Sequence, residues 1–293
     1  FSPSGDFFVS IKPSEISGGH SVIKQIEMKL KRILIFTATI LMASACRKEK
    51  EIMDNTTARD NSTAESMFND LLKVAHDISE GTEGIREYET GCIDNVTVDL
   101  DASPMTVLVD FGNDECLGAD GRYRNGQILL TYTGRYRDAG TIITVTPINY
   151  KVNGYLIEGS KTITNMGLNE DGQPYFNIVS DVELTAPGNA WSIDWTSNRT
   201  RTWVTGFGTM SVWDDEYDIT GSSSGTNRFG NPFTATILVP LHVTIGCPWV
   251  VSGECKLEPE GAPVRNIDFG SGECNAGFTV TVNGEDYTFF GGN

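Results

Sequence analysis

The spacing of apolar residues changes once along the chain, and this change separates a helix from a β-rich region. Before residue 80, apolar residues recur three and four positions apart, which is the period of one helix face. They are Met67, Phe68, Leu71, Leu72, Val74, Ala75 and Ile78. We expect one short amphipathic helix from about Thr63 to Ser79, with Ser62 or Thr63 as its N-cap and Gly81 as its stop.

From Asn95 onward, apolar and polar residues alternate in short segments separated by Gly, Asn and Asp. These segments are rich in Thr, Val, Ile and aromatic residues, as strands are. They are "VTVDL", "TVLVDF", "QILLTYTGRY", "TIITVTPINYKV", "YLIEGSKTIT", "YFNIVSDVELT", "WSIDWTS", "RTWVTGF", "TATILVPLHVTI" and "FTVTV". The predicted fold class is all-β, with elongated antiparallel sheets that are sandwich-like or extended.

Three Asn-Gly pairs stand between apolar runs, at residues 125–126, 153–154 and 283–284. Both residue types tolerate the positive φ of a tight type I′ turn, so each pair predicts a hairpin. An internal repeat supports this pattern, because "VDFGNDEC" at residues 109–116 matches "IDFGSGEC" at residues 267–274. The same offset of 158 relates the first and third Asn-Gly pairs. We therefore expect two related hairpin units, near residues 92–132 and 247–290, at the ends of the β region.

The cysteines follow the repeat. Cys92 precedes Cys116 by 24 residues, and Cys247 precedes Cys274 by 27. In an oxidising compartment this predicts one disulfide in each unit and leaves Cys255 unpaired. The alternative, in which Cys255 pairs with Cys247 or Cys274, stays open, because a short strand could bring it beside either partner.

The first 65 residues have the composition of an export signal and a tether. Lys29, Lys31 and Arg32 precede a 13-residue apolar run, residues 33–45, which is too short to span a membrane. We expect a signal peptide over residues 28–45, translated sequence upstream of the true start over residues 1–27, and a flexible polar tether over residues 46–65. The helix and a linker follow over residues 66–91, and the β-rich domain covers residues 92–293.

"MASAC", which ends at Cys46, resembles a lipobox. Lipid on Cys46 would make the membrane a partner, since two or more acyl chains anchor a protein stably. Arg47 follows where an Asp would favour retention in the inner membrane, so we expect the outer membrane, with the chain facing the periplasm or the medium. The alternative is an ordinary signal peptide that ends at a cysteine by chance.

The charge of the chain excludes one class of partner. Its formal net charge is −17, and the first 45 residues carry five Lys/Arg and three Asp/Glu, so removing their net +2 leaves −19. Such acidity repels phosphate backbones, so nucleic acid is not expected as a partner.

The repeated Asp-Phe-Gly invites a metal-site interpretation. A kinase-type magnesium site would also need a Gly-rich loop and a catalytic loop, which the sequence lacks. A calcium loop built from Asp110, Asn113, Asp114 and Glu115 is a weaker alternative. The second copy has Ser271 and Gly272 at the middle positions, so we expect a turn whose Phe faces the core, with no metal and no cofactor.

Four tryptophans are the best candidates for ligand binding: Trp191, Trp195, Trp203 and Trp213. Flat rings on a sheet can stack on sugar rings, so a glycan is a candidate partner, and an envelope protein is another. The interpretation that we favour over binding is that these rings fill the core between strands.

Catalytic chemistry has little support in the sequence. His242 lies within an apolar strand and is expected to be packed or at an edge, and no G-x-S-x-G motif is present. "WDDEYD" at residues 213–218, followed by "GSSSGTNRFGN", is more typical of a solvated loop than of paired catalytic carboxylates. The candidate acids of a polysaccharide enzyme would be Asp214 and Asp215.

With the lipobox, tether, helix and β region in place, the chain resembles a group of lipoproteins of Bacteroidota bacteria. The stretches that carry the resemblance are "YKVNGYLIEGSKTITN", "TRTWVTGFGT" and "CPWVVSGECKLEPEGAPVRNIDFGSGECNAGFTVTVNG". The resemblance implies export and an all-β fold, and it supplies no activity for named residues. We expect a membrane-anchored envelope protein that acts as a binding or structural module, with an enzyme acting on surface polysaccharide as the alternative.

Overall fold

The computed structural model describes residues 55–79, 92–118, 120–209, 211 and 213–290. All of them belong to one compact unit, Ile52–Asn293. The predicted signal peptide, the lipidation site Cys46 and the first part of the predicted tether lie outside the described residues.

The described residues form fourteen strands in one antiparallel sheet, so the all-β antiparallel prediction is confirmed. The order follows the chain, except that β4 pairs with β2, and β3 pairs with β4 beside that path. The strands are β1 (Asn95–Asp99), β2 (Met105–Asp110), β3 (Cys116–Leu117), β4 (Tyr123–Tyr132), β5 (Ile142–Val152), β6 (Tyr155–Leu168), β7 (Pro174–Thr185), β8 (Ser192–Thr205), β9 (Glu216–Thr226), β10 (Pro232–Thr244), β11 (Ser252–Pro259), β12 (Arg265–Ser271), β13 (Gly277–Val282) and β14 (Glu285–Phe290). Short connections favour this order, because neighbouring antiparallel strands need only a tight turn between them.

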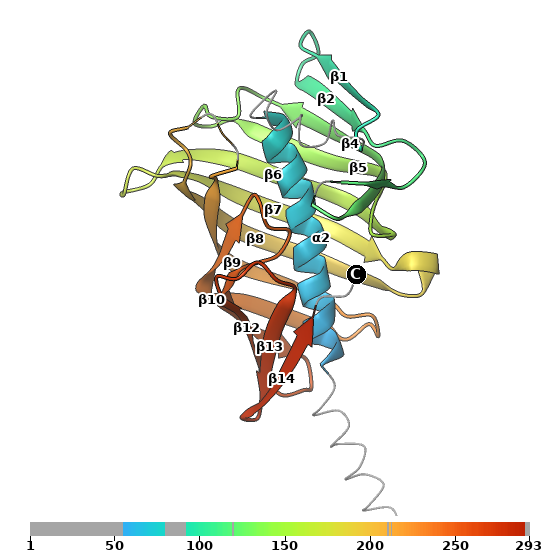
Figure 1. Ribbon diagram of the computed structural model, residues 1–293, viewed down its shortest axis with the longest axis vertical. Helices are drawn as coiled ribbons and strands as arrows, with labels where there is room; N and C mark the ends of the chain where they lie inside the picture. The colour runs from blue at the N-terminus through green and yellow to red at the C-terminus, as the bar shows by residue number, and fades with distance from the viewer. Residues whose placement is uncertain (1–54, 80–91, 119, 210, 212, 291–293) are drawn as a thin grey trace, which may run out of the picture. The chain divides into compact units, whose positions relative to one another are not determined.

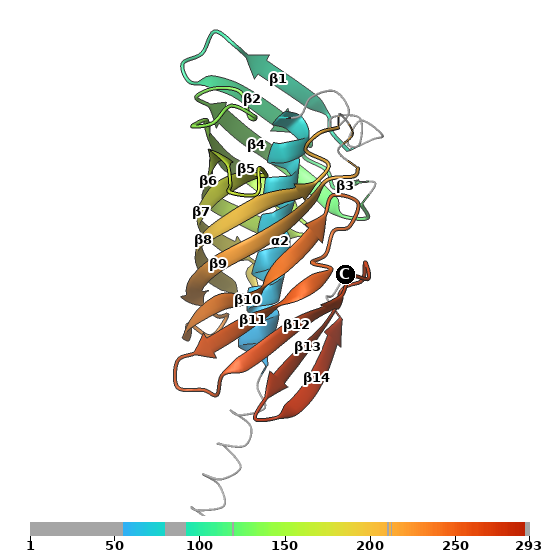
Figure 2. The ribbon, with the colours of Figure 1, turned by 90° about the vertical axis from the view of Figure 1, so that its left-hand side faces the viewer.

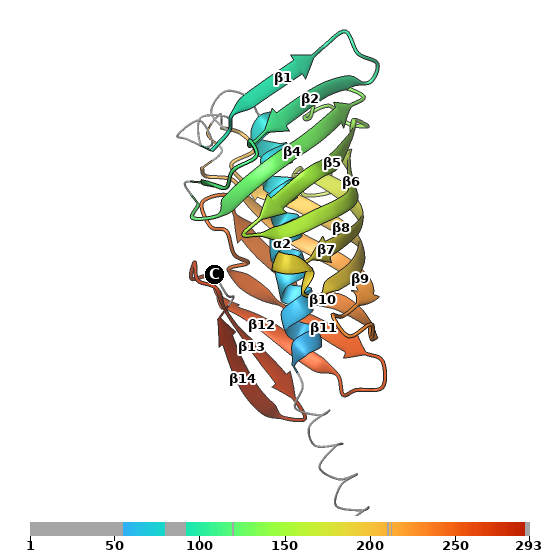
Figure 3. The ribbon, with the colours of Figure 1, turned by 90° about the vertical axis from the view of Figure 1, so that its right-hand side faces the viewer.

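Helix α2 (Thr56–Ser79) runs across the strands along the hollow side of the sheet (Figure 1). Figure 2 and Figure 3 show the sheet curving around this helix, with β4 to β9 on one side and β12 to β14 on the other. The apolar face of α2 packs on the inner face of the sheet, where the Phe68 ring stacks on Trp195 with centroids 4.6 Å apart. The helix is therefore the centre of the core.

The predicted helix exists, but it begins at Thr56 and not near Thr63. The expected tether over residues 46–65 is therefore wrong from Thr56 onward. Polar residues of the first turns are buried because the sheet supplies their partners. Arg228 Nε donates to Asp60 Oδ1 at 2.8 Å, and Trp195 Nε1 donates to Asn61 Oδ1 at 3.4 Å.

The expected solvated loop is wrong from Glu216 to Thr226, where "EYDITGSSSGT" forms β9. Gly221 is required there, because a Cβ at this position would lie 2.3 Å from the Asn198 carbonyl oxygen of β8. Ser223 of the same strand is buried and accepts a hydrogen bond from Arg199. "WSIDWTS" and "RTWVTGF", predicted as two strands, are the single strand β8.

Two of the three Asn-Gly hairpins are confirmed. Residues 153–154 connect β5 to β6, and residues 283–284 connect β13 to β14, with positive φ at both positions of each pair. The prediction is wrong for Asn125-Gly126, which lies inside β4 beside a bulge against β5. A Cβ on Gly126 would lie 2.2 Å from the Asn149 carbonyl oxygen, so a close approach of strands, not a hairpin, requires this glycine.

The repeated Asp-Phe-Gly lies at the end of β2 in the first copy, as expected for a turn, but the second copy lies inside β12 at a register shift against β11, so the expected turn is wrong there. Asp110 Oδ1 accepts a hydrogen bond from Gly112 N at 2.9 Å, and Asp268 Oδ1 accepts one from Gly270 N at 2.7 Å. Phe111 is buried and Phe269 packs half-buried against the core.

Both predicted disulfides are present: Cys92–Cys116 and Cys247–Cys274. Cys255 is unpaired and buried, so the alternative pairings through Cys255 are wrong. The side chain of Cys255 faces the core from β11, where burial raises the pKa of its thiol to about 12.

Candidate functional site

A groove of about 240 Å³ lies between the first half of α2 and the end of the sheet formed by β12 to β14. We call it the aromatic groove, because seven of its lining residues are aromatic: Tyr155, Trp191, Trp249, Phe269, Phe278, Phe289 and Phe290. Polar residues on the opposite wall include Arg59, Ser62, Thr63 and Ser66 of α2. The groove therefore has an aromatic side and a hydroxyl-bearing side.

The aromatic side follows from strand pairing. Phe278 of β13 pairs with Phe289 of β14, and their rings stack with centroids 5.5 Å apart. Phe269 of β12 packs next to Phe278, with centroids 6.2 Å apart. Phe290 ends the last strand and is 77% exposed. Cross-strand aromatic pairs fix these rings in place before any ligand arrives.

The hydroxyl-bearing side follows from helix periodicity. Arg59, Ser62, Thr63 and Ser66 are spaced three and four positions apart, so they share one face of α2. This face is the least buried part of the helix. The Ser62 hydroxyl oxygen is buried and has no hydrogen-bond partner in the protein. A ligand hydroxyl would be a suitable partner for it.

The second disulfide holds two walls of the groove together. Cys247 precedes Trp249 and Val250 in the β10–β11 connection, and Cys274 precedes Asn275 in the β12–β13 connection. Because both connections line the groove, the Cys247–Cys274 bond fixes their separation. The Cys92–Cys116 bond has no part in the groove.

The four predicted tryptophans do not form one site. Trp191 lines the groove, where the Arg228 guanidinium lies 4.0 Å from its ring centroid. Trp195 and Trp203 are 2% and 1% exposed, so the core interpretation holds for these two. Trp213 is 55% exposed and lies outside the groove. Of the predicted binding residues, the structure therefore places only Trp191 in the aromatic groove.

Sequence reasoning missed most of the aromatic side of the groove. Trp249 and the phenylalanines of β12 to β14 were not among the predicted binding residues. A signal was available, because "FTVTVNGEDYTFF" contains two short alternating segments around an Asn-Gly turn, with aromatic residues at both outer ends. Pairing the two strands across that turn brings Phe278 opposite Phe289.

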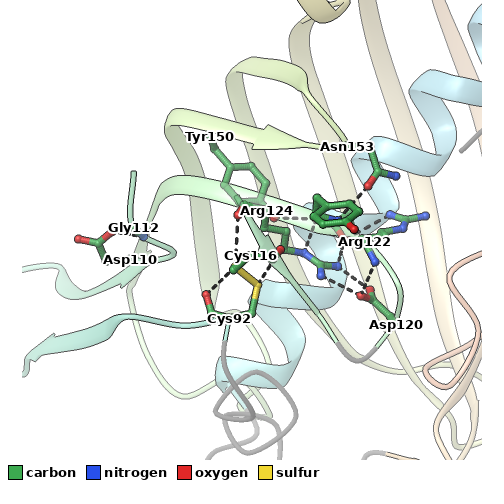
Figure 4. Close-up of a disulfide and its surroundings, with 11 residues drawn as sticks. Cys92, Asp110, Gly112, Cys116, Asp120, Arg122, Arg124, Tyr150 and Asn153 are labelled. Atoms are coloured by element: carbon green, nitrogen blue, oxygen red, sulfur yellow. Dashed lines mark hydrogen bonds and ion pairs between the residues drawn. A yellow bond between two sulfur atoms is a disulfide. The ribbon is translucent and has the colours of Figure 1, made fainter. Parts of the chain in front are cut away.

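A second cluster of charges lies near the middle of α2, next to the Cys92–Cys116 disulfide (Figure 4). Cys116 of β3 pairs with Arg124 of β4, whose guanidinium binds both Asp70 and Asp120. Tyr150 OH also donates to Asp70 Oδ2 at 2.7 Å. Burial alone would raise the pKa of Asp70, but Arg124 and Arg122 outweigh it and lower this pKa to about 2. The cluster is an ion network that joins the helix to β4 and β5.

A third cluster corrects the prediction that residues 213–218 are solvated. Asp215 is 1% exposed and lies 2.9 Å from the Nε2 atom of His76, which is fully buried in α2. Trp203 Nε1 donates to Asp215 Oδ1 at 3.1 Å. Burial raises the pKa of the Asp215 carboxyl to about 6. Through these contacts Asp215, the residue before β9, and Trp203 of β8 hold the end of α2 to the sheet.

The remaining candidate residues do not converge. Asp114 and Glu115 are exposed, and both oxygens of Asp110 accept hydrogen bonds, from Gly112 and from Gln127. The described part of the chain contains no group of three His, Cys, Asp or Glu side chains that could hold a metal ion. His242 is half-buried on β10, and its Nδ1 atom lies 2.8 Å from Asp218 Oδ1.

Comparisons with family models, with curated proteins and with solved structures each found no match to this chain. Within the described residues, none of the helical structure combines the length and apolar character that crossing a bilayer requires. The aromatic groove is therefore interpreted from its own chemistry. It presents aromatic faces, hydroxyl groups and two arginines to a small ligand.

Proposed function

We propose that this protein is a cell-envelope lipoprotein, anchored to the outer membrane through Cys46, and that it binds a saccharide in the aromatic groove. The observation that carries the proposal is the pairing of aromatic side chains on one wall with hydroxyl and arginine side chains on the other. Sugar rings have apolar CH faces and polar hydroxyl edges, so they match such a groove. An acyl chain would leave the buried Ser62 hydroxyl without a partner, which disfavours a lipid tail.

Binding without catalysis fits the groove better than hydrolysis does. Glycoside hydrolysis commonly needs two carboxyl groups on either side of the scissile bond. Among the described residues that line the groove, Glu65 is the only carboxylate, and Arg199 Nη2 donates to it at 2.8 Å. Asp214 and Asp215, the acids considered for an enzyme, do not line the groove.

The test is a saccharide array probed with the exported protein and with three variants. Phe290→Ala and Trp191→Ala remove rings from the groove, and Trp213→Ala removes an exposed ring elsewhere. Losing one aromatic contact should cost about 0.5–1.5 kcal/mol, which weakens binding roughly two- to twelvefold. Equal binding by Phe290→Ala, Trp191→Ala and wild type would contradict the groove assignment.

The enzyme alternative has its own readout in the same experiment. Incubating wild-type protein with each bound saccharide should release no reducing ends. Release that Asp214→Asn or Asp215→Asn abolishes would replace the binding proposal with a hydrolase.

A further inference from the structure

A second cavity, of about 40 Å³, lies beside the middle of α2 and is independent of the saccharide proposal. We call it the arginine cavity. Its wall contains Lys73 from α2, Arg122 from just before β4 and Arg201 from β8, together with the carboxylates of Asp70 and Asp120. Trp249 lies between this cavity and the aromatic groove.

Arg201 is the unusual member of this wall. It is 2% exposed, and its Nε and Nη1 atoms are buried without a hydrogen-bond acceptor in the protein. Its close contact is the face of the Tyr217 ring, 3.3 Å from the guanidinium carbon to the ring centroid. A ring face offsets part of the charge but does not accept the in-plane N–H groups. A buried guanidinium with unpaired donors is costly unless another acceptor is present.

Arg122 adds a further donor to the same cavity. It is 4% exposed, and its Nη atoms donate to Ser66, Asp70 and Pro248. Its Nε atom has no acceptor in the protein. Two buried arginines that line one small cavity therefore have unpaired N–H groups. These groups require an acceptor, and the species that offers acceptors without donors is an anion.

The carboxylates of the wall are already used. Asp70 accepts from Arg122, Arg124 and Tyr150, and Asp120 is paired with Arg124. These two carboxylates are balanced by Arg122 and Arg124, so the charge of Arg201 is left over. Arg201 also interacts electrostatically with the Asp215 carboxylate, but Asp215 makes its hydrogen bonds to His76, Trp203 and Tyr217.

Arg201 also has cationic neighbours. Lys161 is buried, and its Nζ atom donates to the Phe68 carbonyl oxygen at 2.6 Å. Burial lowers the pKa of Lys161 to about 7; Glu65 opposes this shift, while Arg201 and Arg199 add to it. An anion beside Arg201 would relieve this accumulation of positive charge.

We infer that the arginine cavity binds a small inorganic anion, of the size of chloride, next to Arg201 and Arg122. One water needs about 10–15 Å³ of such space, so 40 Å³ accommodates an ion of one or a few atoms and is too small for a sugar phosphate. The anion accepts hydrogen bonds from the guanidinium groups, and small rotations of the two side chains complete them.

Thermal unfolding at constant ionic strength tests this site, with chloride or bromide replacing gluconate. A ligand that binds only the folded state stabilises it by mass action. If chloride binds with a dissociation constant of about 10 mM, 100 mM chloride should raise the folding equilibrium constant about tenfold. Arg201→Met should lose this response. Lys256→Gln removes a surface cation that is paired with Glu258, so it should keep the response and serves as the matched control.

A measurement on the wild type keeps the inference falsifiable if Arg201→Met does not fold. A crystal structure in bromide should show an anomalous peak between Arg201 and Arg122. A peak there, with a saturating halide response, supports the site. Ordered water only, or equal stabilisation by gluconate and chloride, would overturn it.

Discussion

Breaking the Cys247–Cys274 disulfide should loosen the aromatic groove as well as destabilise the fold. The bond closes a loop of 27 residues. In the chain-entropy model such a loop is worth about 12 cal/mol/K, or about 3.5 kcal/mol at 25 °C. The other disulfide closes 24 residues, so its expected contribution is almost the same. Breaking either bond should therefore reduce stability by about the same amount, while only the Cys247–Cys274 bond lies beside the groove.

The comparison uses two double variants, Cys247→Ser/Cys274→Ser and Cys92→Ser/Cys116→Ser. Urea unfolding should give a similar loss of stability, about 3.5 kcal/mol, for both. Cys255→Ala removes no cross-link and should cost only about 1 kcal/mol, as the loss of one small buried group. A cost for Cys255→Ala that equals that of either pair would contradict the assigned disulfides.

Hydrogen exchange then separates the two variants without any ligand. The connections at residues 245–251 and 272–276 should lose protection in Cys247→Ser/Cys274→Ser and retain it in Cys92→Ser/Cys116→Ser. The reason is that Cys247 and Cys274 join these two connections, while Cys116 lies next to Arg124 on β4. Equal exchange in the two variants would refute the idea that this disulfide shapes the groove.

Four further predictions follow from the ion network, the core and the N-terminus. The pKa of Asp70 is about 2 in the folded protein, below its ordinary value of 3.8, so its ionised form should contribute on the order of 2 kcal/mol of stability above about pH 4. This contribution is lost as the pH falls toward 2. The difference in urea stability between wild type and Asp70→Asn should therefore shrink over that range. The pKa of Lys161 is about 7 in the folded protein, below its ordinary value of 10.5, so the unfolded chain binds more protons between these two pH values. The free energy of unfolding of wild type should therefore rise relative to that of Lys161→Met between about pH 7 and pH 9.5, by up to about 1.4 kcal/mol per pH unit. Chelation with EDTA should leave the melting temperature unchanged, and a drop that calcium restores would show that the loop at Asp110 binds metal. Metabolic labelling with a palmitate analogue should mark wild-type protein and not Cys46→Ala, and equal labelling would exclude lipidation at Cys46.

The elements that follow local rules could be predicted from the sequence. Alternation and β-branched residues predict the strands, and residues 153–154 and 283–284 predict their hairpins because turn geometry depends only on the residues in the turn. The two disulfides follow from the repeat. These predictions succeeded because each rests on contacts between residues close in sequence or on a duplicated unit.

The first turns of the helix and the partners of its polar face could not be predicted, because they depend on residues far away in the chain. Asp60, Glu65 and Asp70 resemble solvated residues in sequence, yet Arg228, Arg199 and Arg124 bind them inside the fold. The partners lie more than 50 residues later, Arg124 and Arg199 in strands and Arg228 in the β9–β10 connection. The spacing of apolar residues cannot reveal that the polar face of a helix is buried against basic residues of a sheet.

Positive charges are buried more often than negative ones, so the surface of the protein is more acidic than its net charge suggests. Among the described residues, six buried charged side chains are basic and four are acidic; they are Arg122, Arg124, Lys161, Arg199, Arg201 and Arg265, and Asp60, Glu65, Asp70 and Asp215. The interior therefore holds more positive than negative charge, and the −19 expected after residue 45 understates the acidity of the exterior. An anionic saccharide would have to approach through this field before it reaches Arg59 and Arg228 in the groove. Because salt screens charges beyond about 10 Å at 0.1 M, moderate salt should speed the association of such a ligand, while a neutral saccharide should bind at a rate that salt does not change.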